Sequence, residues 1–318
     1  MIEYQQEVPL LAIIVPCYNE RDMFPVCLTQ LRAVLAGLRE TNKIADKSYL
    51  LFVDDGSRDE TWAMIAQAYK DYPDVRGLKL ASNRGHQRAL WAGLDNVECD
   101  ICVSIDADLQ DDVHVIGQMV DAYLAGNDIV YGVRDNWTSD TLFKRKTAQY
   151  FYKLMTRLGV KQIENHADFR LLSARAVKAL MSYDEENIYL RGLVPLIGYC
   201  STNIYYTRKC RSAGESKYPL KKMLALALEG LTSLSIMPLR VIALTGFTIS
   251  LFSCLAAVYA VIEKLIGNTV EGWSSMMIAI FFLGGIQMLS IGVIGEYIGK
   301  IYMEVKHRPK YIIEKYLQ

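Results

Sequence analysis

The sequence predicts an α/β domain with a mostly parallel sheet, followed by two helices that are long enough to span a membrane. Short apolar runs alternate with segments of helical periodicity, which is the pattern of a doubly wound sheet. After about residue 216 the chain becomes strongly apolar, and this change predicts the membrane part. The chain carries 35 lysine or arginine and 35 aspartate or glutamate residues, so its balanced charge argues against a nucleic-acid-binding protein.

Five apolar runs are the predicted strands, and the segments between them are the predicted helices. The strands are expected at Leu10–Val15, Tyr49–Val53, Val75–Leu80, Ile101–Ile105 and Ile129–Tyr131. The helices are expected at Arg21–Leu38, from Ser57 onward, at Gln87–Val97 and at Val113–Ala125. Ser57 is the predicted N-cap of its helix, because Glu60 three residues later completes a capping box.

Two uncharged runs, Val241–Ile262 and Trp273–Gly295, are the predicted membrane spans. At about 1.5 Å per residue, each is long enough as a helix to cross a bilayer core of roughly 30 Å. The alternative is a pair of buried core helices in a soluble fold. The connector Glu263–Gly272 carries one lysine, whereas the outer flanks are basic, so both termini are expected in the cytoplasm. The basic flanks comprise Lys217, Lys221, Lys222 and Arg240 before the first span, and Lys300, Lys306, Arg308, Lys310 and Lys315 after the second.

The segment before the first span has a mixed character. Tyr218–Leu239 combines lysines with leucines and methionines, which predicts an amphipathic helix in the membrane interface. An ordinary core-facing helix is the alternative. The predicted organisation is a soluble domain at 1–216, an interfacial segment at 217–239, a transmembrane hairpin at 240–299 and a cytoplasmic tail at 300–318. No signal peptide is expected, because Met1–Leu10 has neither a basic start nor a long apolar stretch.

The seven cysteines have irregular spacing. Cys99 and Cys102 fit a C-x-x-C pattern, but Cys102 lies inside a predicted strand and no second pair follows. A reduced cytoplasmic domain is therefore favoured over a zinc or redox site.

The turn Asp106-Ala107-Asp108 is the strongest indication of chemistry in the sequence. It directly follows a predicted strand, so its carboxylates are expected at the carboxyl edge of the sheet, where open α/β sheets bind ligands. Carboxylate oxygens suit Mg²⁺ or Mn²⁺, and such ions often bridge protein carboxylates to a substrate diphosphate. A solvated turn is the plainer alternative for this motif alone.

Three further polar loops follow predicted strands and are expected at the same edge. Their notable residues are Pro16, Tyr18 and Glu20 in the first loop, Asp54, Asp55 and Gly56 in the second, and Asn83-Arg84-Gly85 in the third. Each loop alone is compatible with turn and cap chemistry. Four such loops in order, each after a strand, favour a single ligand site.

With these motifs the chain resembles the glycosyltransferases of family 2, which have the GT-A fold. Segments Pro16–Glu20, Asp54–Ser57 and Asp106–Gln110 match the successive nucleotide-sugar motifs of that family. The closer resemblance is to the polyprenyl-phosphate glycosyltransferases, such as dolichol-phosphate mannose synthase and the bacterial bactoprenol glucosyltransferases. It rests on Tyr131–Arg134, Asp168–Arg170, Gly214–Tyr218 and Gly295–Tyr302, and covers nearly the whole chain.

The resemblance implies a role for each motif residue. Asp108 and Gln110 are expected to hold Mg²⁺ or Mn²⁺ on the donor diphosphate. Asp106, Asp108 and Asp168 are the expected catalytic residues. Asp168 is expected on the acceptor side, where it either orients the acceptor or binds donor hydroxyls, because a phosphate acceptor is already ionised. The residues expected to contact the nucleotide sugar are Pro16, Tyr18, Glu20, Asp54, Asp55, Asp106, Ala107 and Asp108.

The acceptor implied by the resemblance is a polyprenyl phosphate, whose charge calls for cationic ligands. Arginine binds phosphate bidentately and lysine binds it as a point charge. For Lys146 and its basic neighbours, a solvated helix face or a contact with anionic lipid headgroups is the alternative. The candidate phosphate ligands are Arg134, Lys146, Arg208, Arg211 and Lys217.

The activity implied by the resemblance is inverting transfer of one sugar to undecaprenyl phosphate at the inner leaflet of a bacterial inner membrane. The first choice of donor is UDP-glucose, and the product would serve surface glycan modification, such as that of O-antigen. A homo-tetramer is also implied. One rival is a processive polysaccharide synthase, but the chain lacks the Arg-Trp dipeptide of that acceptor motif. The other rival is a catalytically inactive membrane scaffold, against which the intact carboxylates argue.

Overall fold

The computed structural model describes residues 8–134, 166–186, 188–207, 237–266 and 272–318. The chain divides into two compact units. The first comprises Met1–Leu154, Lys161–Lys217 and Arg308–Gln318, and the second comprises Met155–Val160 and Tyr218–His307. The segment after the apolar helices therefore belongs to the same unit as the α/β domain.

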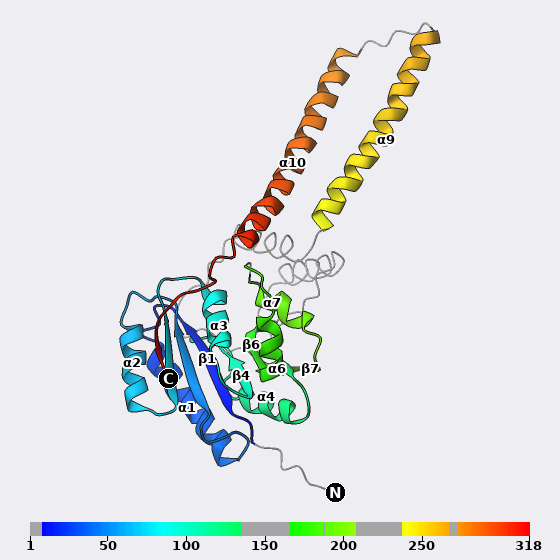
Figure 1. Cartoon of the computed structure of the whole chain (residues 1–318). Helices are drawn as coiled ribbons and strands as arrows, with labels where there is room; N and C mark the ends of the chain where they lie inside the picture. Colours follow the sequence, from blue (N-terminus) through cyan, green and yellow to red (C-terminus); the bar gives the residue numbers. More distant parts are fainter. Residues whose placement is uncertain (1–7, 135–165, 187, 208–236, 267–271) are drawn as a thin grey trace. The chain divides into compact units, whose positions relative to one another are not determined.

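Among the described residues of the first unit, eight strands form one sheet in the order β7-β5-β6-β4-β1-β2-β3-β8. Figure 1 shows part of this sheet, with β1, β4, β6 and β7 labelled. The pairs β1–β2, β1–β4, β2–β3 and β5–β7 are parallel, which confirms the predicted mostly parallel α/β fold. The strands are β1 Leu11–Cys17, β2 Tyr49–Asp54, β3 Val75–Leu80, β4 Ile101–Ser104, β5 Ile129–Arg134, β6 His166–Ser173, β7 Ser201–Tyr206 and β8 Ile313–Leu317.

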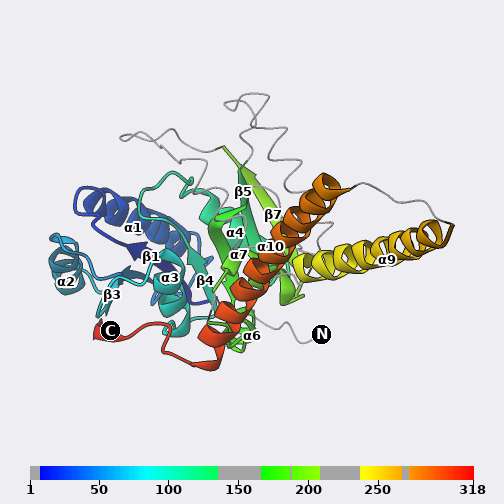
Figure 2. The same ribbon diagram turned by 90° about the horizontal axis from the view of Figure 1, so that it is seen from above.

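Helices cover both faces of this sheet, so that two separate cores form. In β1, Leu11 and Ile13 face one core while Ala12 and Ile14 face the other, as the two-residue period of a strand requires. Residues of α1, α2 and α4 line the first core, and residues of α3, α6 and α7 line the second. Figure 2 shows α1 and α3 on opposite sides of β1. The helices are α1 Phe24–Glu40, α2 Thr61–Asp71, α3 His86–Asp95, α4 Val115–Leu124, α6 Ala174–Met181 and α7 Leu190–Leu193, with a 3₁₀ turn η1 at Val194–Leu196.

The predicted start of the second helix at Ser57 is wrong. Helix α2 begins at Thr61, and the carboxylate of Asp59 accepts the Thr61 N–H at 3.0 Å. The hydroxyl of Ser57 instead accepts the N–H of Asn19 at 3.0 Å, in the loop after β1. A distant backbone group therefore competes successfully for the side chain that the local pattern assigned to a cap.

Three strands have no counterpart in the sequence-based prediction. Strand β6 pairs antiparallel with both β4 and β5, and β7 pairs with β5 at the sheet edge. Strand β8, in the segment expected as a plain tail at 300–318, pairs antiparallel with β3. The Lys79–Glu314 ion pair, at 2.9 Å between Nζ and Oε2, supports this pairing.

Two long apolar helices make up the described part of the second unit, α9 at Met237–Ile266 and α10 at Trp273–Val305. Their most apolar segments, Met237–Ala256 and Phe282–Val305, are 20 and 24 residues long and have mean hydropathies of 1.8 and 1.3. Each is therefore long and apolar enough to cross a membrane, and neither segment is buried within the protein. Helix α10 continues past the predicted end of the second span at Gly295. The predicted interfacial segment at 217–239 lies almost entirely outside the described residues.

Candidate active site

The loops after β1 and β2 are tied together at the carboxyl edge of the sheet. The N–H of Asn19 donates to Ser57, and the N–H of Glu20 donates to Thr61 Oγ1 at 2.9 Å. Asn19 has a positive φ of 54°, and its Oδ1 accepts the N–H of Arg58 at 2.9 Å. The predicted convergence of these loops on one edge is confirmed.

Asp54 and Asp55 are buried anchors of this edge. The two oxygens of Asp55 accept the N–H groups of Arg84 at 2.7 Å and Gly85 at 2.9 Å, which holds the loop between β3 and α3. Asp54 accepts the N–H of Ser57 at 3.3 Å. Burial raises the pKa of both carboxyls, and these hydrogen bonds oppose that rise. The predicted contacts of both residues with the donor nucleotide stay predictions.

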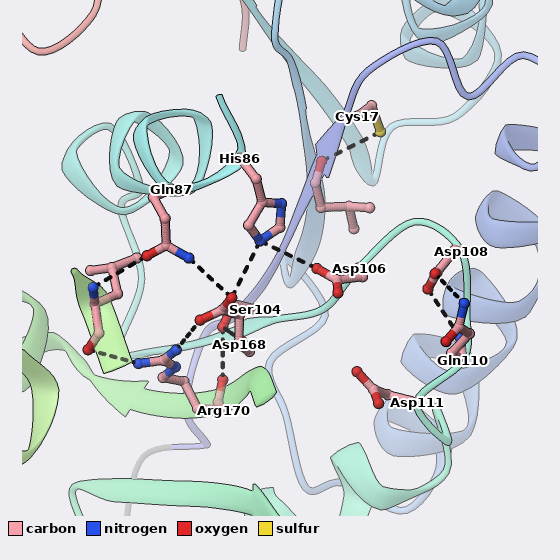
Figure 3. Close-up of polar contacts among 12 residues, drawn as sticks. Cys17, His86, Gln87, Ser104, Asp106, Asp108, Gln110, Asp111, Asp168 and Arg170 are labelled. Atoms are coloured by element: carbon pink, nitrogen blue, oxygen red, sulfur yellow. Dashed lines mark hydrogen bonds and ion pairs between the residues drawn. The ribbon is translucent and has the colours of Figure 1, made fainter. Parts of the chain in front are cut away.

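The Asp-x-Asp turn follows the end of β4 (Figure 3). Asp106 lies beside His86, whereas Asp108 lies beside Gln110. The side chain of Asp106 is 38% exposed, whereas Ala107 is buried. Leu109 has a positive φ of 50°, an uncommon conformation for a bulky residue, and this brings Gln110 back toward Asp108. The backbone N–H and the Nε2 of Gln110 donate to Asp108 at 3.2 and 2.6 Å. The predicted metal pair, Asp108 and Gln110, therefore lies in direct contact.

Carboxylates crowd this part of the edge. Partial burial and then the charges of Asp108, Asp59 and Asp106 raise the pKa of Glu20. Burial also raises the pKa of Asp106. There the charge of His86 acts in the opposite direction, while Asp168, Asp111 and Asp108 reinforce the rise.

Asp108 and Gln110 fit part of the coordination sphere of a divalent cation. Among the residues that the structure describes, no group of three His, Cys, Asp or Glu side chains is arranged to hold a metal ion. Magnesium commonly uses one or two carboxylates and completes its sphere with water and substrate phosphates. The crowded negative charge is also relieved by a cation. The donor set therefore suits an ion that binds together with a diphosphate.

Asp168, in β6, is 5% exposed and lies among five donor groups. Figure 3 shows those of His86, Gln87 and Arg170. Its Oδ1 accepts from Arg170 Nη2 at 2.5 Å and from Arg191 Nε at 3.4 Å. Its Oδ2 accepts from Gln87 Nε2 at 3.1 Å and Arg191 Nη2 at 3.2 Å, and lies 3.5 Å from His86 Nε2. Because β6 runs antiparallel to β4, the start of β6 brings Asp168 to the carboxyl edge.

The surroundings of Asp168 keep it ionised. Burial acts to raise the pKa of Asp168, but the hydrogen bond from His86 and the charges of Arg170 and Arg191 outweigh it and hold the pKa far below its usual range. Arg170 is itself buried, and its Nη1 donates to the carbonyl of Leu190 at 3.2 Å. A carboxylate with such a low pKa is a poor proton acceptor, so Asp168 is suited to holding its neighbours in place.

His86 connects Asp168 with the Asp-x-Asp turn. Its Nε2 lies 3.4 Å from Asp106 Oδ1 and 3.5 Å from Asp168 Oδ2. Burial acts to lower the pKa of His86, but the hydrogen bond to Asp168 and the charge of Asp106 outweigh it and raise the pKa. Since His86 is the first residue of α3, three elements that are separate in the sequence meet at this imidazole.

Arg134, a predicted phosphate ligand, is bound within the protein. Its Nη2 lies 2.9 Å from Asp111 Oδ1, and its Nε donates to the same oxygen at 3.0 Å. The hydroxyl of Tyr206 donates to Asp111 Oδ1 at 2.6 Å. Asp111 follows the metal pair in sequence, so this network braces the far end of the Asp-x-Asp loop.

The remaining predicted residues have mixed outcomes. Pro16 lies within β1, and Tyr18, the first residue after this strand, is 41% exposed. The other four candidate phosphate ligands lie outside the described residues, namely Lys146, Arg208, Arg211 and Lys217.

Sequence reasoning identified Asp168 but missed the residues that hold it, His86, Gln87 and Arg191. The loop Asn83-Arg84-Gly85 was singled out as the third polar loop, and His86 and Gln87 follow it directly. Extending that motif by two residues would have found both. Arg191 has no comparable local signal, because only the folding of α7 brings it to the site.

Residues 12–181, more than half of the chain, match the family model of Glycosyl transferase family 2. The chain belongs to this family. The glycosyltransferase also matches the GtrB C-terminal hairpin at residues 237–301, a range that contains α9 and most of α10. The predicted fold class, family and enzyme class are therefore confirmed.

The relatives of this glycosyltransferase extend over nearly the whole chain. It is 51% identical over 312 residues to the uncharacterized glycosyltransferase YkoT of Bacillus subtilis, covering 98% of this chain and 93% of the relative. It is 39% identical over 310 residues to the SfII prophage-derived bactoprenol glucosyl transferase of Shigella flexneri, covering 96% and 97%. Among solved structures, the mannosyltransferase PcManGT of Pyrobaculum calidifontis, in complex with GDP-Man and Mn²⁺, has a TM-score of 0.44 at 15% identity, covering 93% and 85%.

Proposed function

We propose that this glycosyltransferase transfers one sugar from a nucleotide diphosphate donor to a polyprenyl phosphate. The observation that carries the proposal is the Asp106–Asp108 turn at the carboxyl edge of the sheet, in a chain with two apolar helices after its catalytic domain. The 39% identity to a bactoprenol glucosyl transferase supports this acceptor class and makes glucose from UDP-glucose the first choice of donor.

On the donor side, the loops after β1, β2 and β4 would share the nucleotide sugar. Tyr18, Glu20, Asp54 and Asp55 are proposed for the base and ribose, and Asp106 for the ribose or sugar. Asp108 and Gln110 would hold Mg²⁺ or Mn²⁺, which supplies positive charge to the departing diphosphate. The two side chains are adjacent, which supports a shared site, and binding of the ion would require the amide oxygen of Gln110, in place of the Nε2 that donates to Asp108, to face it.

The proposed reaction is a direct displacement at the sugar C1. An oxygen of the acceptor phosphate forms the new bond to C1, the bond from C1 to the nucleotide diphosphate breaks, and the configuration inverts. The second pKa of a phosphate monoester is about 6, so the acceptor is largely ionised near neutral pH and needs no general base. The low pKa of Asp168 agrees with this, because such a carboxylate is a poor proton acceptor and would be a weak general base.

The proposed location is the cytoplasmic face of a bacterial inner membrane, where the site would meet lipid phosphates of the inner leaflet. The basic flanks of the two apolar runs support a hairpin with both termini in the cytoplasm. Single-cysteine labelling in a variant without native exposed cysteines tests the hairpin. Asn268 should react from outside the membrane and Gln318 from inside, whereas reaction of both from one side would reject the topology. A homo-oligomer is a further proposal, which crosslinking in membranes would test.

The experiment that tests the function uses the detergent-purified full chain, a short polyprenyl phosphate and a panel of nucleotide sugars. Mass spectrometry of the lipid should reveal a product with one added hexose, formed fastest from UDP-glucose. A polymer of the sugar would favour the processive synthase instead. Absence of donor turnover with every nucleotide sugar would favour the inactive scaffold.

A further inference from the structure

Two partly exposed basic side chains, Arg191 and His86, flank the buried carboxylate of Asp168. The side chain of Arg191 is 43% exposed and that of His86 is 42% exposed, whereas Asp168 is 5% exposed. Both side chains contact Oδ2 of Asp168, at 3.2 Å from Arg191 Nη2 and 3.5 Å from His86 Nε2. The carboxylate thus fixes two groups that still present part of their surface to solvent.

Asp168 itself contacts more basic groups than one carboxylate neutralises, and the other carboxylate of the cluster, Asp106, lies 3.4 Å from His86. Arg170 is fully buried against Asp168 at 2.5 Å and already neutralises it. Arg191 is therefore a second guanidinium on one carboxylate, and the charge of Arg134 acts on it as well. A partly exposed guanidinium with cationic neighbours and a fixed orientation attracts an anion.

Arg134 is less available for the same task. Its side chain is 25% exposed, compared with 43% for Arg191. Each arginine uses its Nε and Nη2 on a carboxylate, Arg134 on Asp111 and Arg191 on Asp168. Removing Arg134 from Asp111 would leave a carboxylate that is 2% exposed without that cation, which is costly. Arg191 is the better placed of the two to meet a ligand.

We propose that Arg191 and His86, held by Asp168, form the binding site for the phosphate monoester of the acceptor. This inference rests on the proposed function and deepens it by assigning the acceptor site. A guanidinium binds phosphate oxygens bidentately, and the imidazole of His86 adds a further donor when it is protonated. His86 also lies 3.4 Å from Asp106, in the donor loop, so an anion at this site is next to the proposed position of the sugar.

The test uses the full-length Arg191→Gln and His86→Gln variants, with Arg175→Gln as the matched control. Arg175 is also an exposed arginine paired with a buried aspartate, Asp128, but it lies at the opposite edge of the sheet. The KM for a short polyprenyl phosphate is measured at saturating nucleotide sugar, and nucleotide affinity is measured by calorimetry. Arg191→Gln should raise the lipid KM by about tenfold or more, as expected for loss of a charge-assisted hydrogen bond. His86→Gln should raise it by a smaller factor, and Arg175→Gln should leave it unchanged.

The nucleotide measurement separates the acceptor phosphate from the donor diphosphate. The Kd for the nucleotide should stay within about twofold of wild type in both site variants, because a lost charge-assisted hydrogen bond would change it by considerably more. An unchanged lipid KM in Arg191→Gln, or a parallel loss of nucleotide affinity, would overturn the assignment. Arg134→Gln provides a further arm, since a larger rise in lipid KM there than in Arg191→Gln would move the phosphate site to Arg134.

Binding without turnover distinguishes this inference from the proposed function. Phosphorus NMR of the polyprenyl phosphate is recorded with wild type and Arg191→Gln in the absence of donor. The matching polyprenol and inorganic phosphate are added as competitors in separate titrations. If wild type binds the phosphate but forms no glycolipid, the proposed function fails and the acceptor site stands. Equal binding by both proteins, or displacement by the alcohol as effective as by inorganic phosphate, would reject the site. Arg191→Lys should recover part of the lost affinity, and similar melting temperatures of all variants would exclude a folding defect.

Discussion

Two groups of carboxylates lie at the same edge of the sheet and differ in almost every physical respect. In the Asp-x-Asp turn, Asp106 is partly exposed and like charges contribute to raising its pKa. Asp168 is buried, touches two arginines, a histidine and a glutamine, and has a strongly lowered pKa. Asp106 shares the imidazole of His86 with Asp168, whereas Asp168 also contacts two guanidinium groups.

This difference indicates which carboxylates are suited to bind a cation and which are already paired with protein groups. A crowded, partly exposed carboxylate gains from a cation that arrives with the substrate. A buried and fully paired carboxylate gains nothing from such a ligand, and its value lies in fixing its partners. Both kinds are aspartates at strand ends, so only their neighbours separate a site for a cation from a site for an anion.

The largest expected effect is on catalysis by Asp108→Ala. Loss of the metal ligand at the leaving group should cost about 4 kcal/mol of transition-state stabilisation, or roughly a thousandfold in rate. The melting temperature should stay close to wild type, because Asp108 is only partly buried. Initial rates and thermal unfolding check both parts. A chelator should reproduce the loss, with rescue by Mg²⁺ or Mn²⁺, and full activity in excess chelator would contradict the role of a metal.

Asp168→Ala should show the opposite pattern and mainly reduce stability. It leaves the fully buried Arg170 without its counter-charge, and breaking a buried ion pair in this way costs about 3–5 kcal/mol. Urea unfolding of the detergent-solubilised protein measures the change. The double variant Asp168→Ala/Arg170→Met is the control, and it should recover part of the lost stability. A single variant as stable as wild type would show that the cluster is not an anchor.

The stabilising contribution of Asp168 should depend on pH with a definite sign. Its pKa is lower in the folded state than the value of about 3.9 for an unfolded chain. Its contribution is therefore fully present above about pH 5 and is lost as the pH falls toward the folded-state pKa. The difference in unfolding free energy between wild type and Asp168→Asn should shrink between about pH 5 and pH 3. A difference that stays constant or grows over this range would contradict the lowered pKa.

The smallest expected effect comes from Tyr206→Phe, behind the Asp-x-Asp loop. It removes the buried 2.6 Å hydrogen bond to Asp111, which as a bond to a charged group contributes about 2 kcal/mol. Activity should fall modestly with little change in lipid KM, because the loop rather than the acceptor site is loosened. Steady-state kinetics with varied lipid and varied donor separate the two. A selective rise in lipid KM would indicate that Tyr206 and Arg134 contact the acceptor.

The sequence predicted what is contiguous along the chain and missed what only folding brings together. Asp106, Asp108 and Gln110 form one motif after one apolar strand, so both their position and their contact could be anticipated. The partners of Asp168 come from α3 and α7, far apart in the sequence, and no local pattern announces Arg191. Ser57 was misjudged for the same reason, because its hydroxyl serves a loop 38 residues away.

Strand β8 has a consequence for the order in which the protein is made. It follows α10 in the chain, yet it closes the edge of the sheet beside β3, and Tyr316 donates to the carbonyl of Asn96 at 2.7 Å. During synthesis, the ribosome must complete both apolar helices before this strand exists. Until then, β3 exposes unpaired backbone groups, which are prone to pair with other chains. Synthesis of both apolar helices therefore precedes completion of the catalytic domain, and the sheet is finished last.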